Sequence, residues 1–308
     1  MIRPPALRPG ARVALVAPAG PVVDEGIDRA AQRIRDWGWE PVVGAHARGS
    51  HLGYLSAGDE ARAADFNAAL RDPSIDALWS LRGGYGVMRI LPAIDWNALA
   101  ARPRPVIGYS DNTAIHSVMA RMGIVSFHAP HPATVEFNDF SREVFLRVLE
   151  EGAPAGLLPF PADHAGRAET LAPGVAEAPL VGGNLSLVAA TLGTPYAIDA
   201  RGSILFLEEV GESAYKLDRL LTQLLLAGVF DGAAGVAVGR FTEVPEPTRP
   251  GTPTPEQLVH ERLGSLGIPV AMGFPFGHVD DNWTLPVGVR ARLDAGAGTL
   301  ELLEAAVG

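Results

Sequence analysis

Residues 104–116, Arg-Pro-Val-Ile-Gly-Tyr-Ser-Asp-Asn-Thr-Ala-Ile-His, have the pattern of a strand, a tight turn with a serine at its apex, and a helix. Such a turn would place the Ser110 hydroxyl at the carboxyl edge of a sheet and aim the N–H groups of the helix start at whatever the hydroxyl attacks. An ordinary Ser-Asp helix cap after a glycine has the same pattern. Asn112 also stands where the G-x-S-x-G turn has its second glycine, so this stretch alone supports both interpretations.

Segments on either side of this turn alternate between strand-like and helix-like patterns. Apolar spacing and acidic first turns predict helices at 24–37, 57–70 and 141–150. Short apolar runs predict strands at 12–18, 40–43, 75–81 and 124–127. Repeated β-α units of this length imply a parallel sheet wrapped by helices. Ligands of such sheets bind at the carboxyl ends of the strands, where Ser110 and the glycine-rich residues 83–86 both fall.

The composition changes after residue 150. Residues 151–179 are rich in Ala, Gly and Pro and show little periodicity, which predicts an interdomain connection. Beyond them, helices are expected at 185–192 and 214–227, and strands at 203–207, 236–238, 270–272, 287–293 and 300–303. The chain is therefore expected to be an α/β protein with a parallel-sheet domain at 1–150 and a smaller mixed or β-barrel-like domain at 180–308.

Composition limits the possible functions. With 308 residues, 47 % of them hydrophobic, the chain can fill the core of one large or two ordinary domains. It has no cysteine, which excludes disulfides and thiolate chemistry, and Lys216 is its only lysine, so a Schiff base would have to form there. The formal net charge of −10 argues against a general nucleic-acid binder. No signal peptide or membrane-spanning stretch is recognisable, so we expect a cytoplasmic protein with no membrane partner.

A serine nucleophile needs a base within hydrogen-bond reach, usually a histidine, and a carboxylate that fixes the tautomer of that base. His278 lies in a glycine- and proline-bounded loop after a strand, from which a side chain can project into a cleft. A loop histidine bonded to Asp280 or Asp281 would have the same surroundings. Glu208 is the first acidic residue after the strand at 203–207, and strand alternation sends the next residue to the opposite face.

Three further histidines lie near this region of the sequence. His116 is well inside the helix after the turn and is expected to point away from the apex, as a packed or capping residue. His128 and His131 flank an Ala-Pro pair at the end of a strand, close to where a substrate would lie. They fit either substrate binding or stabilisation of the loop.

The glycines at 83, 84 and 86 follow a predicted strand directly. Their N–H groups can line an oxyanion hole together with the N–H of Asp111. They could equally cradle a phosphate, although their spacing matches neither G-x-G-x-x-G nor a P-loop. A purely structural glycine turn is a third possibility.

The chain resembles the LD-carboxypeptidases, the serine peptidase family of muramoyltetrapeptide carboxypeptidase, along nearly its whole length. The segments that carry the resemblance occur in the family's order: residues 13–18, 53–62 with Asp65, 80–86, 108–111 with Thr113, 182–186, 207–210, 215–219, 277–278 and 285–288. Two departures are Glu209, where the family commonly has Asp, and Ala129, where it usually has Gly.

The resemblance implies a catalytic triad in which Ser110 is the nucleophile, His278 the general base and Glu208 the residue that orients the base. It implies an oxyanion hole formed by the N–H groups of Gly84, or of its neighbour, and of Asp111. It also implies a flavodoxin-like first domain, a smaller β-rich second domain, a homodimer, and activity without metal or cofactor. The implied substrate is a cytoplasmic muropeptide, cleaved between the L-centre of its third residue and its terminal D-Ala during wall recycling.

A carboxypeptidase must also hold the terminal carboxylate of its substrate. In this acidic chain that role falls to a local positive group, Arg82 or Arg89, or to helix-end N–H groups. Arg82 directly precedes the glycines and is preferred, although an arginine bonded to loop carbonyls has the same position. Tyr85 and His128 are the other expected substrate contacts.

Two other functions stay open. A branch of the same family removes amino-acyl nucleotide toxins of the microcin C type, and adenine binding would favour an aromatic platform near the cleft. Residues 151–200 contain no tryptophan, which favours the cell-wall peptide. A non-enzymatic module that binds an anion or nucleotide at the glycines is the second alternative, and it predicts that Ser110→Ala leaves ligand affinity intact. An α/β-hydrolase esterase is disfavoured by Asn112.

Overall fold

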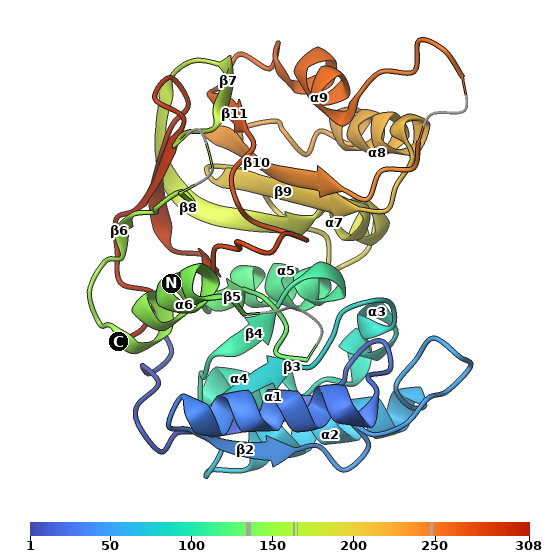
Figure 1. The fold of residues 1–308 in the computed structure, drawn as a ribbon, viewed down its shortest axis with the longest axis vertical. Helices are drawn as coiled ribbons and strands as arrows, with labels where there is room; N and C mark the ends of the chain where they lie inside the picture. Colours follow the sequence, from blue (N-terminus) through green and yellow to red (C-terminus); the bar gives the residue numbers. More distant parts are fainter. Residues whose placement is uncertain (134–136, 163, 165, 247–248) are drawn as a thin grey trace.

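The computed structural model describes residues 1–133, 137–162, 164, 166–246 and 249–308. The chain forms one sheet of six strands and one of eight, and Figure 1 shows them one above the other. The earlier part of the chain builds most of the lower sheet, and the later part builds the upper sheet. Helix α5 (Thr113–Arg121) lies between them, directly after the serine turn.

The first sheet has the strand order 2-1-3-4-5 of flavodoxin-like folds. Its parallel strands are β1 (Arg12–Val16), β2 (Glu40–Val43), β3 (Ala77–Ser80), β4 (Val106–Gly108) and β5 (Ser126–His128). A sixth strand from near the end of the chain, β12 (Leu285–Val287), pairs with β5 in the antiparallel sense. The expected flavodoxin-like fold is therefore confirmed, and a strand from the second half of the chain extends its sheet.

Successive residues of β1 point to opposite faces of this sheet, and helices cover each face. Val13 and Leu15 pack in one cluster with α1 (Asp24–Asp36) and α6 (Asp139–Glu150). Ala14 and Val16 pack in another with α2 (Asp59–Arg71), α4 (Trp96–Ala101) and α5. The helices expected at 24–37, 57–70 and 141–150 are confirmed to within two residues at each end.

Two short helices follow the glycine-rich residues and are not predicted by the sequence. They are α3 (Val87–Ile90) and the 3-10 helix η1 (Leu91–Ala93). Segments of this length complete about one helical turn, so they leave no apolar periodicity to detect. Helix α3 begins directly after Gly86, which has a φ of 134°.

The second sheet is mixed. Its strands, in spatial order, are β6 (Gly156–Leu157), β14 (Thr299–Leu302), β13 (Arg290–Asp294), β8 (Val175–Asn184), β9 (Ile204–Val210), β10 (Gly235–Thr242), β11 (Val270–Met272) and β7 (Glu169–Ala172). The four strands β8 to β11 run parallel, and the outer strands are antiparallel to their neighbours. Among the described residues no strand pairing joins β6 to β7. Backbone hydrogen bonds nevertheless tie both ends of β7 to the β13–β14 hairpin, from the N–H of Ala168 to the Gly298 carbonyl (2.9 Å) and from the N–H of Ala295 to the Gly174 carbonyl (2.9 Å).

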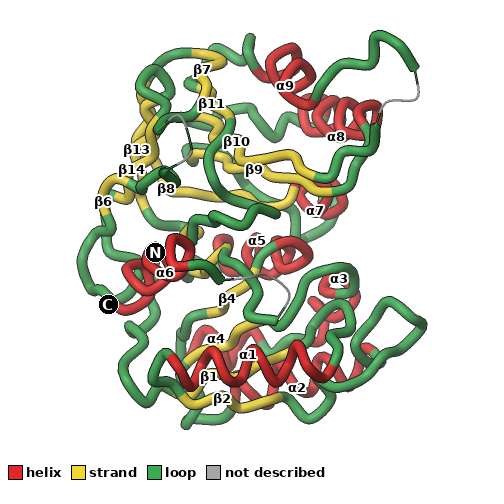
Figure 2. The backbone as a smooth tube through the Cα atoms, viewed as in Figure 1, coloured by secondary structure: helices red, strands yellow, loops and turns green. Residues whose placement is uncertain are grey.

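One face of the second sheet is covered by three helices, which Figure 2 shows in red on the right of the upper half. They are α7 (Leu185–Thr191), α8 (Ala214–Leu226) and α9 (Pro255–Leu263). Leu205 and Leu207 of β9 pack against them. Ile204 and Phe206 point the other way and join the cluster that also contains α1 and α6. The two sheets therefore share a continuous apolar core.

Residues 151–179, which the composition predicts to be a connection, contain β6, β7 and the first half of β8. β8 is a ten-residue strand between β13 and β9, whereas β6 and β7 are short and lie at the two edges of the sheet. Backbone hydrogen bonds to neighbouring strands hold such segments, so they need no apolar alternation of their own. The two ends of the chain also meet, because the N–H of Gly308 donates to the carbonyl of Pro4 (3.0 Å). Within the described ranges no helix is both long and apolar enough to cross a bilayer.

Candidate active site

The serine turn has an unusual backbone. Ser110 has a φ of 59°, a left-handed conformation that residues other than glycine rarely adopt. The turn continues as a 3-10 helix, η2 (Ser110–Asn112), into α5. The Asn112 amide donates to the carbonyl of Tyr109 (3.1 Å), and the Ser80 hydroxyl donates to Asn112 Oδ1 (2.6 Å). The Asn112 side chain therefore stabilises the turn through two hydrogen bonds, at the position where the G-x-S-x-G pattern has its second glycine.

The glycine-rich loop lies directly against the serine. A Cβ added to Gly83 would come within 2.7 Å of Ser110 Cβ and 2.9 Å of its Oγ, so only glycine fits. The Gly83 carbonyl accepts a hydrogen bond from the N–H of Gly20 (3.0 Å). Gly84, with a φ of 101°, lines the same pocket as the serine. The loop expected to supply an oxyanion hole is thus beside the hydroxyl, and the sequence did not identify Gly83 as the closest contact.

Two buried charged groups fix this loop. The Arg62 guanidinium is fully buried and donates to the carbonyls of Gly86 (2.9 Å) and Pro18. The Asp111 carboxylate accepts a hydrogen bond from the N–H of Val87 (2.8 Å), the first residue of α3. Burial raises the pKa of Asp111 to about 6, against the opposing effects of the Val87 bond and of Arg62. This role of Arg62 was not predicted from the sequence. Its only signal there is an arginine at an inward-facing position of a helix.

Glu208 and His278 come together from different parts of the second half. Glu208 lies in β9, and His278 lies in the loop after β11. His278 Nδ1 is 2.7 Å from Glu208 Oε2. A Cβ on Gly277 would come within 2.7 Å of Glu208, so a glycine is needed for this approach. His278 is thus bonded to Glu208 and not to a neighbouring aspartate. Asp281 accepts instead from the Asn138 amide (2.6 Å).

Electrostatics make His278 more basic than an ordinary histidine. Burial alone would lower its pKa, but the buried Glu208 carboxylate, by its charge and its hydrogen bond, raises the pKa of His278 above the usual 6.5. Glu209 and Glu243 act in the same direction. Glu208 is 0 % exposed, and its Oε1 has no hydrogen-bond partner within the described part of the chain. The carboxylate therefore has the imidazole as its main partner.

Glu209 points to the other side of β9, as strand alternation predicts. Its carboxylate accepts from the Asn184 amide (2.9 Å) and from the N–H of Ser186 (2.8 Å) at the start of α7. Burial raises the pKa of Glu209, and these hydrogen bonds oppose that shift. Only Glu208 of the pair reaches His278.

The serine and the histidine line one pocket of 660 Å³ between the two halves of the chain. Its walls include Ser110, His278, Gly84, Arg82, His131 and Glu243. Within the described residues the Ser110 hydroxyl makes no hydrogen bond, so it is available to a ligand. With Nδ1 occupied by Glu208, the second ring nitrogen of His278, Nε2, is the atom left to act as a base.

The other histidines have different surroundings. His116 is buried, with Nε2 2.7 Å from the Gly108 carbonyl and Nδ1 2.9 Å from Ser126 Oγ, as expected for a packed residue. His128 is 0 % exposed, does not line the pocket, and has neither ring nitrogen paired among the described residues. His128 is the last residue of β5, where β12 pairs with it and the ring of Phe206 packs against its imidazole (5.2 Å between centroids). Of the two histidines that the sequence offers as substrate contacts, His131 therefore lines the pocket and His128 does not.

The expected substrate contacts at the loop differ in their positions. Arg82 lines the pocket and donates to the Pro21 carbonyl (2.9 Å). Arg89 is held away from it by Asp59, at 2.8 Å. Tyr85 is 49 % exposed and packs beside Tyr54 (5.9 Å between ring centroids), outside the pocket. Of these side chains, Arg82 alone is placed to reach a ligand beside Ser110.

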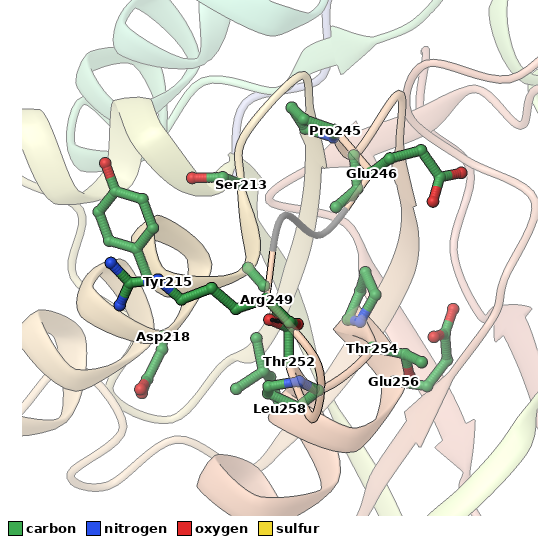
Figure 3. A pocket seen from close by; sticks show the side chains of 14 residues that line it. Ser213, Tyr215, Asp218, Pro245, Glu246, Arg249, Thr252, Thr254, Glu256 and Leu258 are labelled. Atoms are coloured by element: carbon green, nitrogen blue, oxygen red, sulfur yellow. Dashed lines mark hydrogen bonds between the residues drawn. The ribbon is translucent and has the colours of Figure 1, made fainter.

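A larger cavity lies elsewhere, between α8 and the segment that precedes α9 (Figure 3). It measures 990 Å³, and Tyr215, Asp218 and Arg249 project into it from its sides. The described residues that line it include Ser213 but no histidine that could act as a base. Of these two cavities, the smaller one therefore brings a serine and a histidine together. No group of three or more metal-ligating side chains was found among the described residues.

Comparison with known proteins matches both halves of the chain. Residues 13–129 match the family of the LD-carboxypeptidase N-terminal domain, and residues 177–293 match that of the LD-carboxypeptidase C-terminal domain. A Streptomyces coelicolor protein, provisionally named a carboxypeptidase, is 43 % identical over 319 residues, which cover 98 % of this chain and 96 % of that protein. The murein tetrapeptide carboxypeptidase of Pseudomonas aeruginosa is 32 % identical over 292 residues, covering 92 % and 93 %.

Solved structures show the same fold. The structure of MccF in complex with glutamyl sulfamoyl guanosine aligns over all of both chains with a TM-score of 0.90. At 23 % identity this likeness supports the fold alone. The matches to both family domains and the 43 % identity over nearly the full length establish the family. The chain therefore belongs to the LD-carboxypeptidase family.

Proposed function

We propose that this protein is a serine carboxypeptidase that releases the terminal D-Ala from muramoyl tetrapeptides, by hydrolysing the bond between the L-centre of the third residue and that D-Ala. One observation carries the proposal. Ser110, from the first half, lines the same pocket as His278, whose Nδ1 lies 2.7 Å from the buried Glu208 of the second half. The named activity of the Pseudomonas relative supports the choice of substrate.

In the proposed mechanism, Ser110 Oγ attacks the carbonyl carbon of the L–D amide while His278 Nε2 accepts its proton. The N–H groups of Gly84 and Asp111 stabilise the negative charge that develops on the carbonyl oxygen. His278 then gives the proton to the departing amino group of D-Ala. Water attacks the acyl-enzyme with His278 again as base, which releases the tripeptide and restores Ser110.

Charge on the pocket walls supports a direction for the substrate. Arg82 belongs to the first half of the chain and lies beside the glycine-rich loop. Its guanidinium can hold the carboxylate of the terminal D-Ala, which must lie on the leaving-group side of Ser110. We further propose that the protein acts as a homodimer in the cytoplasm, as its resemblance to the family implies.

The test is release of free D-Ala from a muramoyl tetrapeptide, followed by mass spectrometry. Wild-type protein should release D-Ala from the tetrapeptide and not from the matching pentapeptide. Ser110→Ala should lower kcat by at least roughly 10³-fold while its melting temperature is retained. Ser213→Ala removes a hydroxyl from the other cavity and should leave turnover unchanged.

Three results would change the assignment. No release by folded wild-type protein, with hydrolysis of an amino-acyl sulfamoyl nucleoside instead, would support the toxin-removing branch of the family. Full activity in Ser110→Ala would exclude Ser110 as the nucleophile. Binding of a nucleotide without turnover, unchanged in Ser110→Ala, would support the non-enzymatic alternative.

A further inference from the structure

The ring of Tyr109, the residue before the proposed nucleophile, packs against two imidazoles. Its centroid is 4.7 Å from that of His278, with 51° between the ring planes. It is 4.6 Å from the centroid of His131, with 36° between the planes. Nothing in the proposed mechanism uses this side chain, although it lines the pocket.

Tyr109 is firmly held. The residue is 4 % exposed, and the Asn112 amide donates to its carbonyl. His131 also packs against the ring, with its Nδ1 2.8 Å from the Ser80 carbonyl. A carbonyl only accepts hydrogen bonds, so this nitrogen carries the proton. Burial lowers the pKa of His131 to about 3, and it therefore stays neutral as it supports the ring.

His278 needs a second constraint besides Glu208. The Cβ–Cγ bond and a single hydrogen bond at Nδ1 hold one edge of the imidazole and still allow the ring to tilt. Such a tilt displaces Nε2, on the opposite edge of the ring, within the pocket that His278 shares with Ser110. A flat ring packed at 4.7 Å limits the tilt, and an aromatic face within about 6 Å also attracts the imidazolium that forms when His278 takes a proton.

We propose that Tyr109 is a positioning residue, whose ring sets the plane of the His278 imidazole so that Nε2 faces Ser110. This inference rests on the proposed function, because it requires His278 to act as the base for Ser110. It assigns to the residue before the nucleophile a role that Phe could fill and an aliphatic residue could not.

The test uses a reagent that needs no natural substrate. A fluorophosphonate forms a bond between Ser110 Oγ and phosphorus, with fluoride leaving and the serine proton passing to His278. The second-order rate of this labelling reports how well His278 activates Ser110. In a parallel measurement, the NMR signal of the His278 Nδ1 proton reports the hydrogen bond to Glu208.

Tyr109→Phe keeps the ring and should label within about threefold of the wild-type rate, with the Nδ1 proton signal retained. Tyr109→Leu and the less crowded Tyr109→Met remove the ring. Both should label about 10- to 100-fold more slowly, the scale expected for a small misplacement of a catalytic group. Their Nδ1 proton signal should broaden, and kcat for D-Ala release should fall more than KM changes.

Phe145→Leu is the matched control. Phe145 is buried in the same half, and its ring stacks on Trp79 at 4.7 Å, away from the pocket. Losing this ring should lower the melting temperature without slowing labelling. If Tyr109→Leu or Tyr109→Met labels at the wild-type rate, or if Tyr109→Phe is as slow as they are, the positioning role is wrong. If the wild-type protein does not label at Ser110, the proposed nucleophile fails instead, whatever Tyr109 does.

Discussion

At the scale of single residues, the buried carboxylate of Asp111 couples protonation to stability. The side chain is 1 % exposed and has one protein donor, the N–H of Val87. Its pKa of about 6 in the folded protein lies above the ordinary 3.8, because burial favours the protonated form. The folded protein thus binds this proton more tightly than the unfolded chain. The contribution of Asp111 to the free energy of unfolding is full below about pH 4 and is lost as the pH rises to 6.

We expect Asp111→Asn, which has the same shape and no titration, to remove this pH-dependent loss. Relative to wild type, its free energy of unfolding should increase between pH 4 and pH 7.5, on the order of 3 kcal/mol at most. Urea unfolding at the two pH values measures the difference. Asp111→Ala, which loses the acceptor for Val87, is the control and should be less stable than Asp111→Asn at both values. A gap between Asn variant and wild type that does not change with pH would contradict the assigned titration.

At the scale of elements, the end of β8 holds the start of α5 beneath the serine turn. The N–H of Asn184 donates to Thr113 Oγ1 (2.9 Å), three residues after Ser110. Gly183, with a φ of 143°, packs on the same threonine, and a Cβ there would overlap Thr113 Oγ1 and come within 2.7 Å of its Cγ2. This contact joins the sheet of the second half to the element that carries the nucleophile.

Gly183→Ala should therefore push α5 away from β8. We expect it to lower the free energy of unfolding by about 1–3 kcal/mol, the usual cost of overpacking. It should also slow fluorophosphonate labelling of Ser110, because α5 begins where the serine turn ends. Gly152→Ala, at a position with no heavy atom within 4 Å of the added Cβ, is the matched control for both measurements. Wild-type labelling by Gly183→Ala would show that β8 does not position the turn.

At the scale of the whole molecule, the two halves complete each other. β12 belongs to the second half of the chain and pairs with β5 at the edge of the first sheet. One cluster of buried side chains contains Leu15 and Phe127 from the first half and Phe206 and Phe276 from the second. Separating the halves would expose this apolar surface and leave the edge of β5 unpaired.

A fragment of residues 1–150, the first domain that we proposed from the sequence, should not fold into a stable monomer by itself. We expect aggregation in size-exclusion chromatography and weak near-UV circular dichroism. Co-expression with residues 151–308 should restore a soluble complex in which Ser110 is labelled. The full chain should unfold in one transition. A fragment that unfolds cooperatively on its own would show that the first half is an independent domain.

Local patterns predicted much of this architecture. The run 12–18 stands out as a continuous apolar stretch because β1 is buried on both faces. The helix signals at 24–37 and 57–70 stand out because each helix buries one face in a core, which imposes a period on the sequence. β6, β7 and α3 gave no such signal, because backbone pairing or a single turn suffices for segments so short. The role of Asn112 was equally hidden, since its partners Ser80 and the Tyr109 carbonyl meet it only in the folded turn.

Neighbouring residues and ordered motifs were enough to predict the strand-turn-helix around Ser110, the opposite directions of Glu208 and Glu209, and the resemblance to the family. The resemblance implied the pairing of Glu208 with His278, which the folded chain shows at 2.7 Å. That His131 rather than His128 lines the pocket, and that Tyr109 packs on His278, could be known only from the folded chain. These contacts join residues up to 169 positions apart. Such distances are set by how two sheets pack around one core, and no local pattern records them.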